Sequence, residues 1–326
     1  EVLWERPRRI ASARRAADVT AQRLVQSGLD LVLAVRTAYA DLRLATERQR
    51  LTGDRAAVLG RTETLMAARV VAGDIAAIDA RPTQVDAASA RLEIERVAQD
   101  VTVARTRLRL LAGLTEDGPA FDLAAAREAD AACAPQAARL REALIARPDV
   151  RAAELAVEAA AARLGWEKSR ILTLSAVLDA NGAGRDGFEA GPGIDASLPI
   201  FGRNQGGRAR ATAELQRAAA AYVAIQQQVA AELREALALS EQARQSVAAW
   251  RARVLPPLET NLADAERQLS GGETSQLPVL EHRRRLIDAQ IRAREFAADV
   301  ERARARVDRA IGRSCPAESE ETPRDR

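Results

Sequence analysis

The sequence is poor in the residues from which a large globular core is usually built. Aromatic residues make up only 3% of its 326 residues, and there are two cysteines, one histidine and one methionine. A core of this size normally buries more Phe, Tyr and Trp, so the composition instead favours long helices that pack through small residues. No run of about eighteen apolar residues occurs, which excludes a transmembrane helix.

The sequence also has little excess of one sign of charge over the other. The net charge is +3, and acidic and basic residues are interspersed along the chain without a basic block. This pattern is typical of a solvated helical surface and argues against nucleic-acid binding.

The residue patterns that carry catalysis or metal binding are missing as well. Cys133 and Cys315 show neither metal-ligand spacing nor a CxxC motif, and their pairing in an oxidising compartment is left open. His282 is the only histidine, and its neighbour Glu281 would lie on a different helix face, so we predict an exposed histidine and no metal site. No nucleophile–base or paired-carboxylate arrangement is recognisable, so we predict no enzymatic activity and no cofactor.

One segment, residues 171–207, departs from the helical pattern of the rest. Apolar and polar residues alternate over Ile171–Asn181 and again over Gly193–Phe201, and a period of two predicts β-strands. The link between these runs is rich in glycine and polar residues, as a hairpin loop is. We therefore predict one amphipathic β-hairpin between two helical tracts. In lipid its edges would be unsatisfied, so a membrane role would require further strands from other copies.

Helical periodicity predicts five segments around this hairpin, at residues 8–72, 82–112, 136–169, 208–269 and 277–311. The second is expected to begin near Pro82, because proline suits the first turn of a helix. An interruption is expected at Arg147–Asp149, and Pro256-Pro257 predicts a kink or a joint in the fourth.

The sequence also contains an internal repeat. Gly73–Gly113 and Gly272–Gly312 each span 41 residues, lie 199 residues apart and carry heptad seams at matching positions. At a similar offset, Glu1–Trp4 corresponds to the end of the second strand. We therefore expect a first strand pair and its preceding helix upstream of Glu1, so that this chain supplies about two strands per protomer.

Five stretches resemble the TolC-type outer-membrane efflux proteins, in particular the channels of heavy-metal and related resistance-nodulation-division pumps. The first is the end of the first returning helix, Leu110–Leu114, and the second is an RPD segment, Ala146–Glu154. The third is a strand-to-helix junction, Ser197–Phe201, and the fourth is the following Gly202–Gly206, which is similar to the metal-efflux branch. The fifth is the descending helix with its tip turn, at Val254–Pro257, Gly272–Ser275 and Val279-Leu280. Two features depart from the family: its first strand pair is largely missing, and Leu269 stands where a tyrosine often precedes the tip glycine.

The resemblance implies a mainly α fold with a small β part. Long antiparallel coiled-coil hairpins in two repeats, plus an amphipathic transmembrane β-hairpin, would build the α-barrel and β-barrel of a trimer. The chain then divides into residues 1–113 as the first helical repeat (preceded by the end of a missing strand), 114–135 as a mid-height linker, 136–170 as the helix leading to the barrel, 171–201 as the β-barrel hairpin, 202–312 as the second helical repeat and 313–326 as a disordered tail.

The family's function is likewise an expectation here. It implies a homotrimer in the cell outer membrane, with a periplasmic helical portion, acting as a passive duct for small molecules or metal ions. The implied partners are outer-membrane lipid, a periplasmic adaptor (membrane fusion) protein and an inner-membrane pump. The sequence does not indicate the substrate, because the metal-branch likeness rests mainly on the junction after Phe201.

Three sets of residues are candidate functional positions. Alternation places a lipid-facing set at Leu172, Leu174, Leu178, Ile194, Leu198 and Ile200 and a lumen-facing set at Thr173, Ser175, Asp179, Asp195 and Ser197. A periplasmic-tip gate or adaptor contact is expected at Gly73, Asp74, Gly271, Gly272, Glu273 and Glu281. Three copies of Glu281 could form an anionic ring, or Glu281 could be a solvated helix residue. Trp4, Trp166 and Phe201 could form an interfacial girdle or pack beneath the barrel.

Two other functions remain alternatives from the sequence. A periplasmic adaptor also has long helical hairpins, but it should carry a split lipoyl-like β domain around a single hairpin. A cytosolic coiled-coil scaffold would need neither the alternating strands nor the RPD segment.

Overall fold

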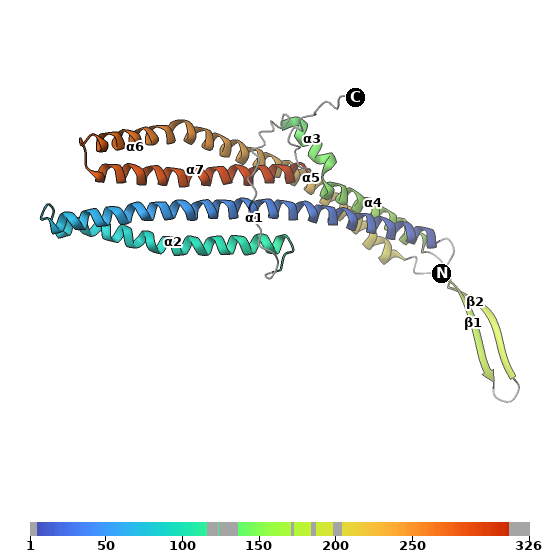
Figure 1. Ribbon diagram of the computed structural model, residues 1–326. Helices are drawn as coiled ribbons and strands as arrows, with labels where there is room; N and C mark the ends of the chain where they lie inside the picture. Colours follow the sequence, from blue (N-terminus) through green and yellow to red (C-terminus); the bar gives the residue numbers. More distant parts are fainter. Residues whose placement is uncertain are drawn as a thin grey trace, which may run out of the picture. The chain divides into compact units, whose positions relative to one another are not determined.

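The computed structural model describes residues 5–115, 123, 136–170, 173–183, 187–197 and 204–312. These residues are mainly helical (Figure 1), with the helices α1 (Glu5–Val71), α2 (Ala77–Leu111), α3 (Gln136–Ala146), α4 (Pro148–Ser169), α5 (Gln205–Arg253), α6 (Leu255–Ser270) and α7 (Gln276–Ile311), and the strands β1 (Thr173–Ala183) and β2 (Gly187–Ser197). None of these helices carries an apolar run sufficient to span a bilayer.

The chain divides into two compact units. Unit 1 contains the start of α1 through Leu29, α3, α4, both strands, α5 through Glu232 and the segment that begins at Ala310. Unit 2 contains the rest of α1, α2, the end of α5, α6 and α7 through Arg309.

Part of the core of unit 2 lies along the α2 seam that the heptad pattern predicts. Leu42 of α1 packs in a cluster with Ala38 and Leu108, and Val101, Ala104 and Leu111 of α2 surround it. A second cluster joins α1 to α7 through Leu51, Val58, Leu280 and Ile287. Small and aliphatic side chains therefore form the centre of both clusters, and the few aromatic residues add contacts such as the edge-to-face pair of Trp250 and Phe296.

An antiparallel series of ion pairs supplements the apolar contacts between α1 and α7. Its members are Asp30–Arg309, Arg36–Asp308, Asp41–Arg302, Arg43–Glu301, Glu47–Arg294 and Arg55–Asp288. Most of these side chains keep a quarter or more of their surface in water, so each pair contributes little on its own. Together they set the register of the two helices.

Glycines end the helices of both repeats in the same way. Gly73 and Gly272 have φ of 79° and 75°, in the left-handed region that side chains with a Cβ disfavour. At the first turn, the Gly73 amide donates to the Val70 carbonyl and the Asp74 amide to the Arg69 carbonyl, which is the Schellman hydrogen-bond pattern. Gly113 and Gly312, 199 residues apart, also have positive φ. The repeat predicted from the sequence therefore has a structural counterpart.

Proline positions explain two helix boundaries and correct a third. The joint expected at Pro256-Pro257 is present, because α5 ends at Arg253 and α6 begins at Leu255. Pro148 opens α4. The expectation that the second helix begins near Pro82 is wrong, since α2 begins at Ala77 and contains Pro82. Proline lacks the amide that would bond four residues back, and here the helix tolerates that loss close to its start.

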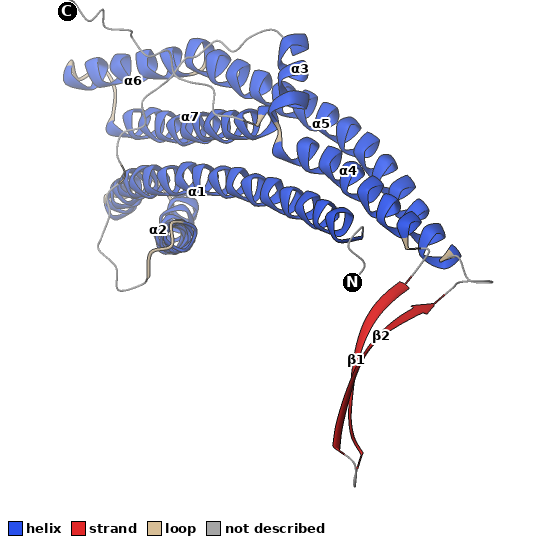
Figure 2. Cartoon of the chain, turned by 90° about the vertical axis from the view of Figure 1, so that its right-hand side faces the viewer, coloured by secondary structure: helices blue, strands red, loops and turns tan. Residues whose placement is uncertain are grey.

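The strands form an antiparallel pair, drawn in red in Figure 2, with bounds that differ from the alternating runs. The sequence placed residues 182–192 in the link, whereas Gly182 and Ala183 belong to β1, and β2 begins at Gly187. Pro192 lies in β2 opposite Leu178. In a two-stranded sheet both strands are edges, where a proline without an amide proton is tolerated. Pairing thus extends through residues whose composition favours a turn.

Candidate functional site

The tip turns place five of the predicted residues at the surface of unit 2. Gly73 and Asp74 follow α1, and Gly271, Gly272 and Glu273 join α6 to α7, all exposed. The second turn repeats the Schellman pattern, since the Gly272 amide bonds the Leu269 carbonyl and the Glu273 amide bonds the Gln268 carbonyl. Each left-handed glycine is thus followed directly by an exposed carboxylate. The tips are well-defined turns rather than extended loops.

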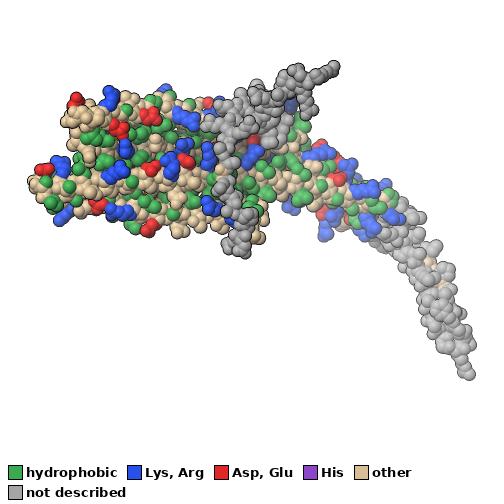
Figure 3. Space-filling view, viewed as in Figure 1, with side chains coloured by type: hydrophobic (Ala, Val, Ile, Leu, Met, Phe, Trp, Pro, Cys, Tyr) green, Lys and Arg blue, Asp and Glu red, His purple; other side chains and the backbone are tan. Residues whose placement is uncertain are grey.

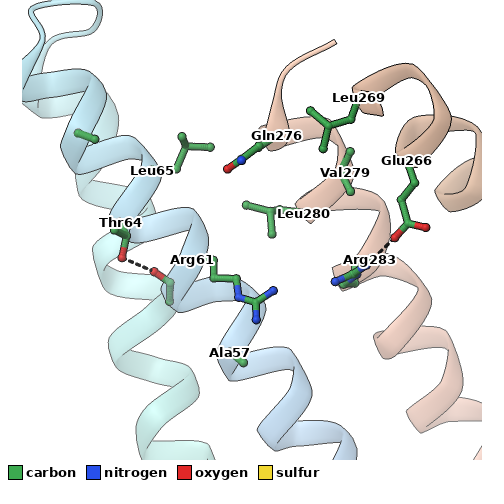
Figure 4. Close-up of a pocket in the computed structure, with 12 residues that line it drawn as sticks. Ala57, Arg61, Thr64, Leu65, Glu266, Leu269, Gln276, Val279, Leu280 and Arg283 are labelled. Carbon is green, nitrogen blue, oxygen red and sulfur yellow. Dashed lines mark hydrogen bonds and ion pairs between the residues drawn. The ribbon is translucent and has the colours of Figure 1, made fainter. Parts of the chain in front are cut away.

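A groove of about 850 Å³ opens beside these turns, between α1 and the α6–α7 pair. Figure 4 shows Leu65 on the α1 side facing Gln276 and Leu280 across the gap. The α1 wall combines the small residues Ala57, Gly60 and Ala68 with Arg61, Thr64 and Leu65, and the opposite wall includes Leu269 and Val279. At the rim, Arg283 forms an ion pair with Glu266. The surface is therefore apolar within and charged at its edge.

Glu281 and His282 lie at the start of α7, between Leu280 and Arg283, which both line the groove. Glu281 is exposed and 3.8 Å from Arg285, one turn further along the helix. His282 was predicted to be exposed, but it is half-buried and its Nδ1 atom is buried without a partner among the described residues. The prediction considered only the neighbour of His282 on its own helix, which does not determine burial in the folded chain.

A second site, in unit 1, joins the end of α4 to the start of α5. Asn204 adopts a φ of 51° and donates from its side-chain amide to the Glu167 carbonyl oxygen at 3.0 Å and to Glu167 Oε2 at 2.6 Å. Glu167 is 7% exposed and also lies 3.4 Å from Arg170. A Cβ atom at Gly207 would come within 2.7 Å of Glu167 Oε2. The asparagine and the glycine of the junction thus close a joint around a buried carboxylate.

A third site is centred on Arg147, whose side chain is fully buried in unit 1. Its guanidinium bonds both oxygens of Asp149, with Nε 3.0 Å from Oδ1, and Nη1 lies 2.8 Å from Glu232 Oε2 and 3.4 Å from the Ala310 carbonyl. Two carboxylates and a carbonyl therefore surround one cation, which links the α3–α4 junction to α5 and to the end of α7.

The sequence around Arg147 is suited to this role. Arg147 is the N-cap residue of α4, with ψ of 127°, and Pro148 occupies the first turn. Gly312 approaches so closely that a Cβ there would lie 2.9 Å from Arg147 Cγ. Burial lowers the pKa of the Arg147 guanidinium, but its hydrogen bonds and ion pairs with Asp149 and Glu232 outweigh burial and raise that pKa.

The strand register groups the predicted barrel residues into two sets. Thr173 pairs with Ser197 and Ser175 with Asp195, whereas Leu174 pairs with Ala196 and Ala176 with Ile194. Direct partners share a face of the sheet, so polar positions lie opposite polar ones. Of the remaining predicted strand positions, Leu178 and Asp179 belong to β1, whereas Leu172, Leu198 and Ile200 lie outside the described residues. Other residues singled out from the sequence also lie outside them, namely Trp4, Phe201, Cys133 and Cys315.

No metal-binding group of three His, Cys, Asp or Glu side chains occurs among the residues that the structure describes. Sequence reasoning missed the groove, the role of Glu167 and the partners of Arg147. A signal for the groove was present, because Ala57, Gly60, Thr64 and Ala68 recur on one face of α1 at steps of three and four. The partners of Arg147 left no comparable signal.

The comparison with known proteins resolves which family these features belong to. The model of the outer membrane efflux protein family matches residues 140–313, more than half of the chain. This chain belongs to the outer membrane efflux protein family. The TolC-type resemblance drawn from the sequence is therefore confirmed, and the adaptor and scaffold alternatives are set aside.

Individual relatives support the same family. The cobalt-zinc-cadmium resistance protein CzcC of Cupriavidus metallidurans is 28% identical over 321 residues, which cover 96% of this chain and 75% of that protein. The CmeC outer-membrane channel of Campylobacter jejuni superposes with a TM-score of 0.79 at 14% identity, covering 97% of this chain and 69% of its own. The open-state MtrE outer-membrane channel of Neisseria gonorrhoeae superposes with a TM-score of 0.72 at 21% sequence identity. The match covers 93% of this chain and 70% of the MtrE chain. The protein is an outer-membrane efflux channel with a periplasmic helical portion.

Proposed function

We propose that this efflux channel is the passive, homotrimeric outer-membrane duct of a three-part assembly, in which its tips receive a periplasmic adaptor that links it to an inner-membrane pump. The observation that carries the proposal is the two-stranded β1–β2 sheet. A bilayer does not tolerate unpaired strand edges. Strands from other copies or from further chain must therefore close a barrel around a lumen.

The register of the hairpin supports one orientation of that barrel. The positions paired as Thr173–Ser197 and Ser175–Asp195 would face the lumen, and those paired as Leu174–Ala196 and Ala176–Ile194 would face lipid. Both strands are 11 residues long, which suits a tilted strand crossing the hydrocarbon core of a bilayer.

The groove in unit 2 supports adaptor docking near the tips. An amphipathic helix presents apolar residues at every third or fourth position, and such a ridge suits a groove with small residues on one wall and Leu269, Val279 and Leu280 on the other. The Arg283–Glu266 pair at the rim and the exposed Asp74 and Glu273 at the turns would select a partner by charge.

Divalent metal ions are the cargo that the comparisons favour. The relative CzcC is named for resistance to cobalt, zinc and cadmium. Exposed Glu281 at the second tip would add an anionic ring in a trimer, which favours cations. Small organic molecules are the alternative cargo.

A deletion strain tests both docking and cargo. Cells without this gene, challenged with zinc, cobalt or cadmium salts, should accumulate more metal than cells that carry it, as measured by elemental mass spectrometry. Returning the wild-type gene to the deletion strain should restore the low metal content. A gene with Gly60→Arg, which fills the groove, should fail to restore it although trimers still reach the outer membrane.

Gly53→Arg is the matched control, because Gly53 lies on the same helix but outside the groove, with open space around its Cβ position. Full rescue by Gly60→Arg would contradict docking in the groove. Equal metal content with and without the gene, together with altered tolerance of organic compounds, would contradict a metal cargo.

A further inference from the structure

Basic side chains gather at the end of unit 1 from which the strands emerge, although the sequence has no basic block. The segments concerned are residues 5–15 of α1, 158–170 of α4 and 205–217 of α5. Together they contain eleven Arg or Lys and four Glu residues, whereas the whole chain has a net charge of only +3. Figure 3 shows Lys and Arg side chains along α1 and α4 toward the strands.

Contacts within unit 1 bring these three segments together. Arg8 donates to the Gly165 carbonyl at 3.3 Å, which places the start of α1 beside the end of α4. Arg163 lies 3.4 Å from Glu214, and Asn204 binds Glu167, so the start of α5 lies at the same end. Charges that are far apart in the sequence therefore form one surface.

Three of the four carboxylates counted above are already engaged. Glu158 pairs with Arg15, Glu214 pairs with Arg163, and Glu167 is buried in the joint with Asn204. Among the described residues, no carboxylate lies within ion-pair distance of a set of exposed cations, which are Arg6, Arg14, Lys168, Arg208, Arg210 and Arg217. We call this set the cationic belt. These cations are exposed to solvent and therefore available to an anionic partner from outside the described chain.

The belt lies at the depth of a membrane surface if the strands cross a bilayer. Lys168 is five residues from the start of β1, which limits the separation of their Cα atoms to roughly 17 Å. Trp166 is half-buried, and the Arg170 guanidinium lies 5.4 Å from its ring centroid. Tryptophan beside arginine is typical of a lipid headgroup region. The charge, the location and the aromatic neighbour thus indicate the same partner.

The structure assigns the cationic belt to anionic phospholipid headgroups of the membrane leaflet that faces the periplasm. This assignment rests on the proposed function, because it needs β1 and β2 in the outer membrane. The phosphates neutralise Arg6, Arg14, Lys168 and Arg208 and fix the depth at which the helices meet the bilayer. Each basic residue at a charged membrane surface adds to the attraction, and salt screens it.

The test uses the full-length protein in detergent, with phosphatidylglycerol and phosphatidylcholine as the lipid probes at equal concentration. Native mass spectrometry then counts each lipid retained. The wild type should retain phosphatidylglycerol in roughly tenfold excess, and Arg6→Gln, Arg14→Gln, Lys168→Gln and Arg208→Gln combined should abolish most of that preference.

The matched control removes four exposed arginines from unit 2 in the same way: Arg81→Gln, Arg105→Gln, Arg107→Gln and Arg234→Gln. It should retain the wild-type preference. Equal lipid ratios for the belt variant and the wild type, or a wild type without preference, would overturn the assignment. In parallel, recovery of the wild type in carbonate-washed phosphatidylcholine vesicles tests membrane insertion alone. Failure there would contradict the proposed function, whereas insertion without lipid preference contradicts only the belt.

Discussion

Unit 1 and unit 2 contain similar helices, but different chemistry stabilises them. In unit 1, Arg147 and Glu167 are buried and hydrogen-bonded to partners on neighbouring elements. In unit 2, apolar clusters along α1 are flanked by ion pairs that mostly remain in contact with water, with Asp308 as a buried exception. Buried polar groups demand specific partners at specific distances, whereas each exposed ion pair contributes little to stability on its own.

The difference indicates a division of labour between the units. In unit 1, which contains the β-hairpin, the buried charged groups are each bonded to specific partners. Unit 2 carries the tips and the groove, where we propose that a partner docks. Its charges are also nearly balanced, since residues 61–91 and 259–285 together contain eight Arg and nine acidic residues. Substitutions in unit 1 should therefore lower the free energy of unfolding more than comparable substitutions in unit 2 do.

The largest effect is expected from Arg147→Met. Loss of the guanidinium leaves Asp149 and Glu232 without their cation, and breaking a buried ion pair typically costs about 3–5 kcal/mol. Urea denaturation followed by circular dichroism should show that loss in the free energy of unfolding. Adding Glu232→Gln should recover part of it, because the uncompensated charge is removed.

Arg151→Met is the control for this prediction. Arg151 is one turn further along α4, exposed, and paired with Glu154 on the same helix. Its removal should leave the unfolding midpoint close to that of the wild type. Similar midpoints for Arg147→Met and Arg151→Met would show that burial adds nothing to the Arg147 network.

A smaller loss is expected from Gly207→Ala. The new methyl group would meet Asn204 Oδ1 and lie 2.7 Å from Glu167 Oε2, so the joint must open. Overpacking of this kind costs about 1–3 kcal/mol. Gly206→Ala adds the same atom one residue earlier in open space and should be neutral or slightly stabilising. Thermal unfolding of the two variants compares them directly, and equal melting temperatures would contradict a closed joint.

The tip glycines come next. Gly272→Ala forces a Cβ into a left-handed turn with φ of 75°, at a cost of about 1 kcal/mol. Gly53→Ala, inside α1 with open space around it, should instead stabilise by about 0.5–1 kcal/mol. Chemical denaturation measures the change in the free energy of unfolding for each variant, and the two changes should have opposite signs. If both variants were destabilised, the turn geometry at Gly272 would not be the cause.

The sequence predicted the elements whose cause is local. Gly73 and Gly272 end helices because of their own backbone freedom, and Pro256 marks a joint because it lacks an amide proton. The heptad seam identified the buried face of α2 and part of the buried surface of α7, where Ala289, Ala303 and Val307 are buried. Each of these features depends on neighbours within a few residues, so a single sequence is sufficient to detect it.

Features that depend on distant residues were not predictable. The role of Arg147 requires Glu232, 85 residues away, and the Ala310 carbonyl, 163 residues away. The groove requires α1 beside α6 and α7. The strand ends are set by pairing of Gly182 with Phe188 and Ala183 with Gly187, against their turn-forming composition. The cationic belt was hidden for the same reason, since three separate segments supply it.

The smallest effect on stability, and the sharpest test of unit 2, concerns Glu281. Its contact with Arg285 is exposed, so Glu281→Gln should leave the unfolding midpoint nearly unchanged. If three copies form an anionic ring around the lumen, the same variant should lower the preference for cations over anions in planar-bilayer conductance. Glu259→Gln removes another exposed carboxylate, at the start of α6, and should leave selectivity as it was. Equal selectivity for both variants would assign Glu281 to the outer, solvated face of the helix.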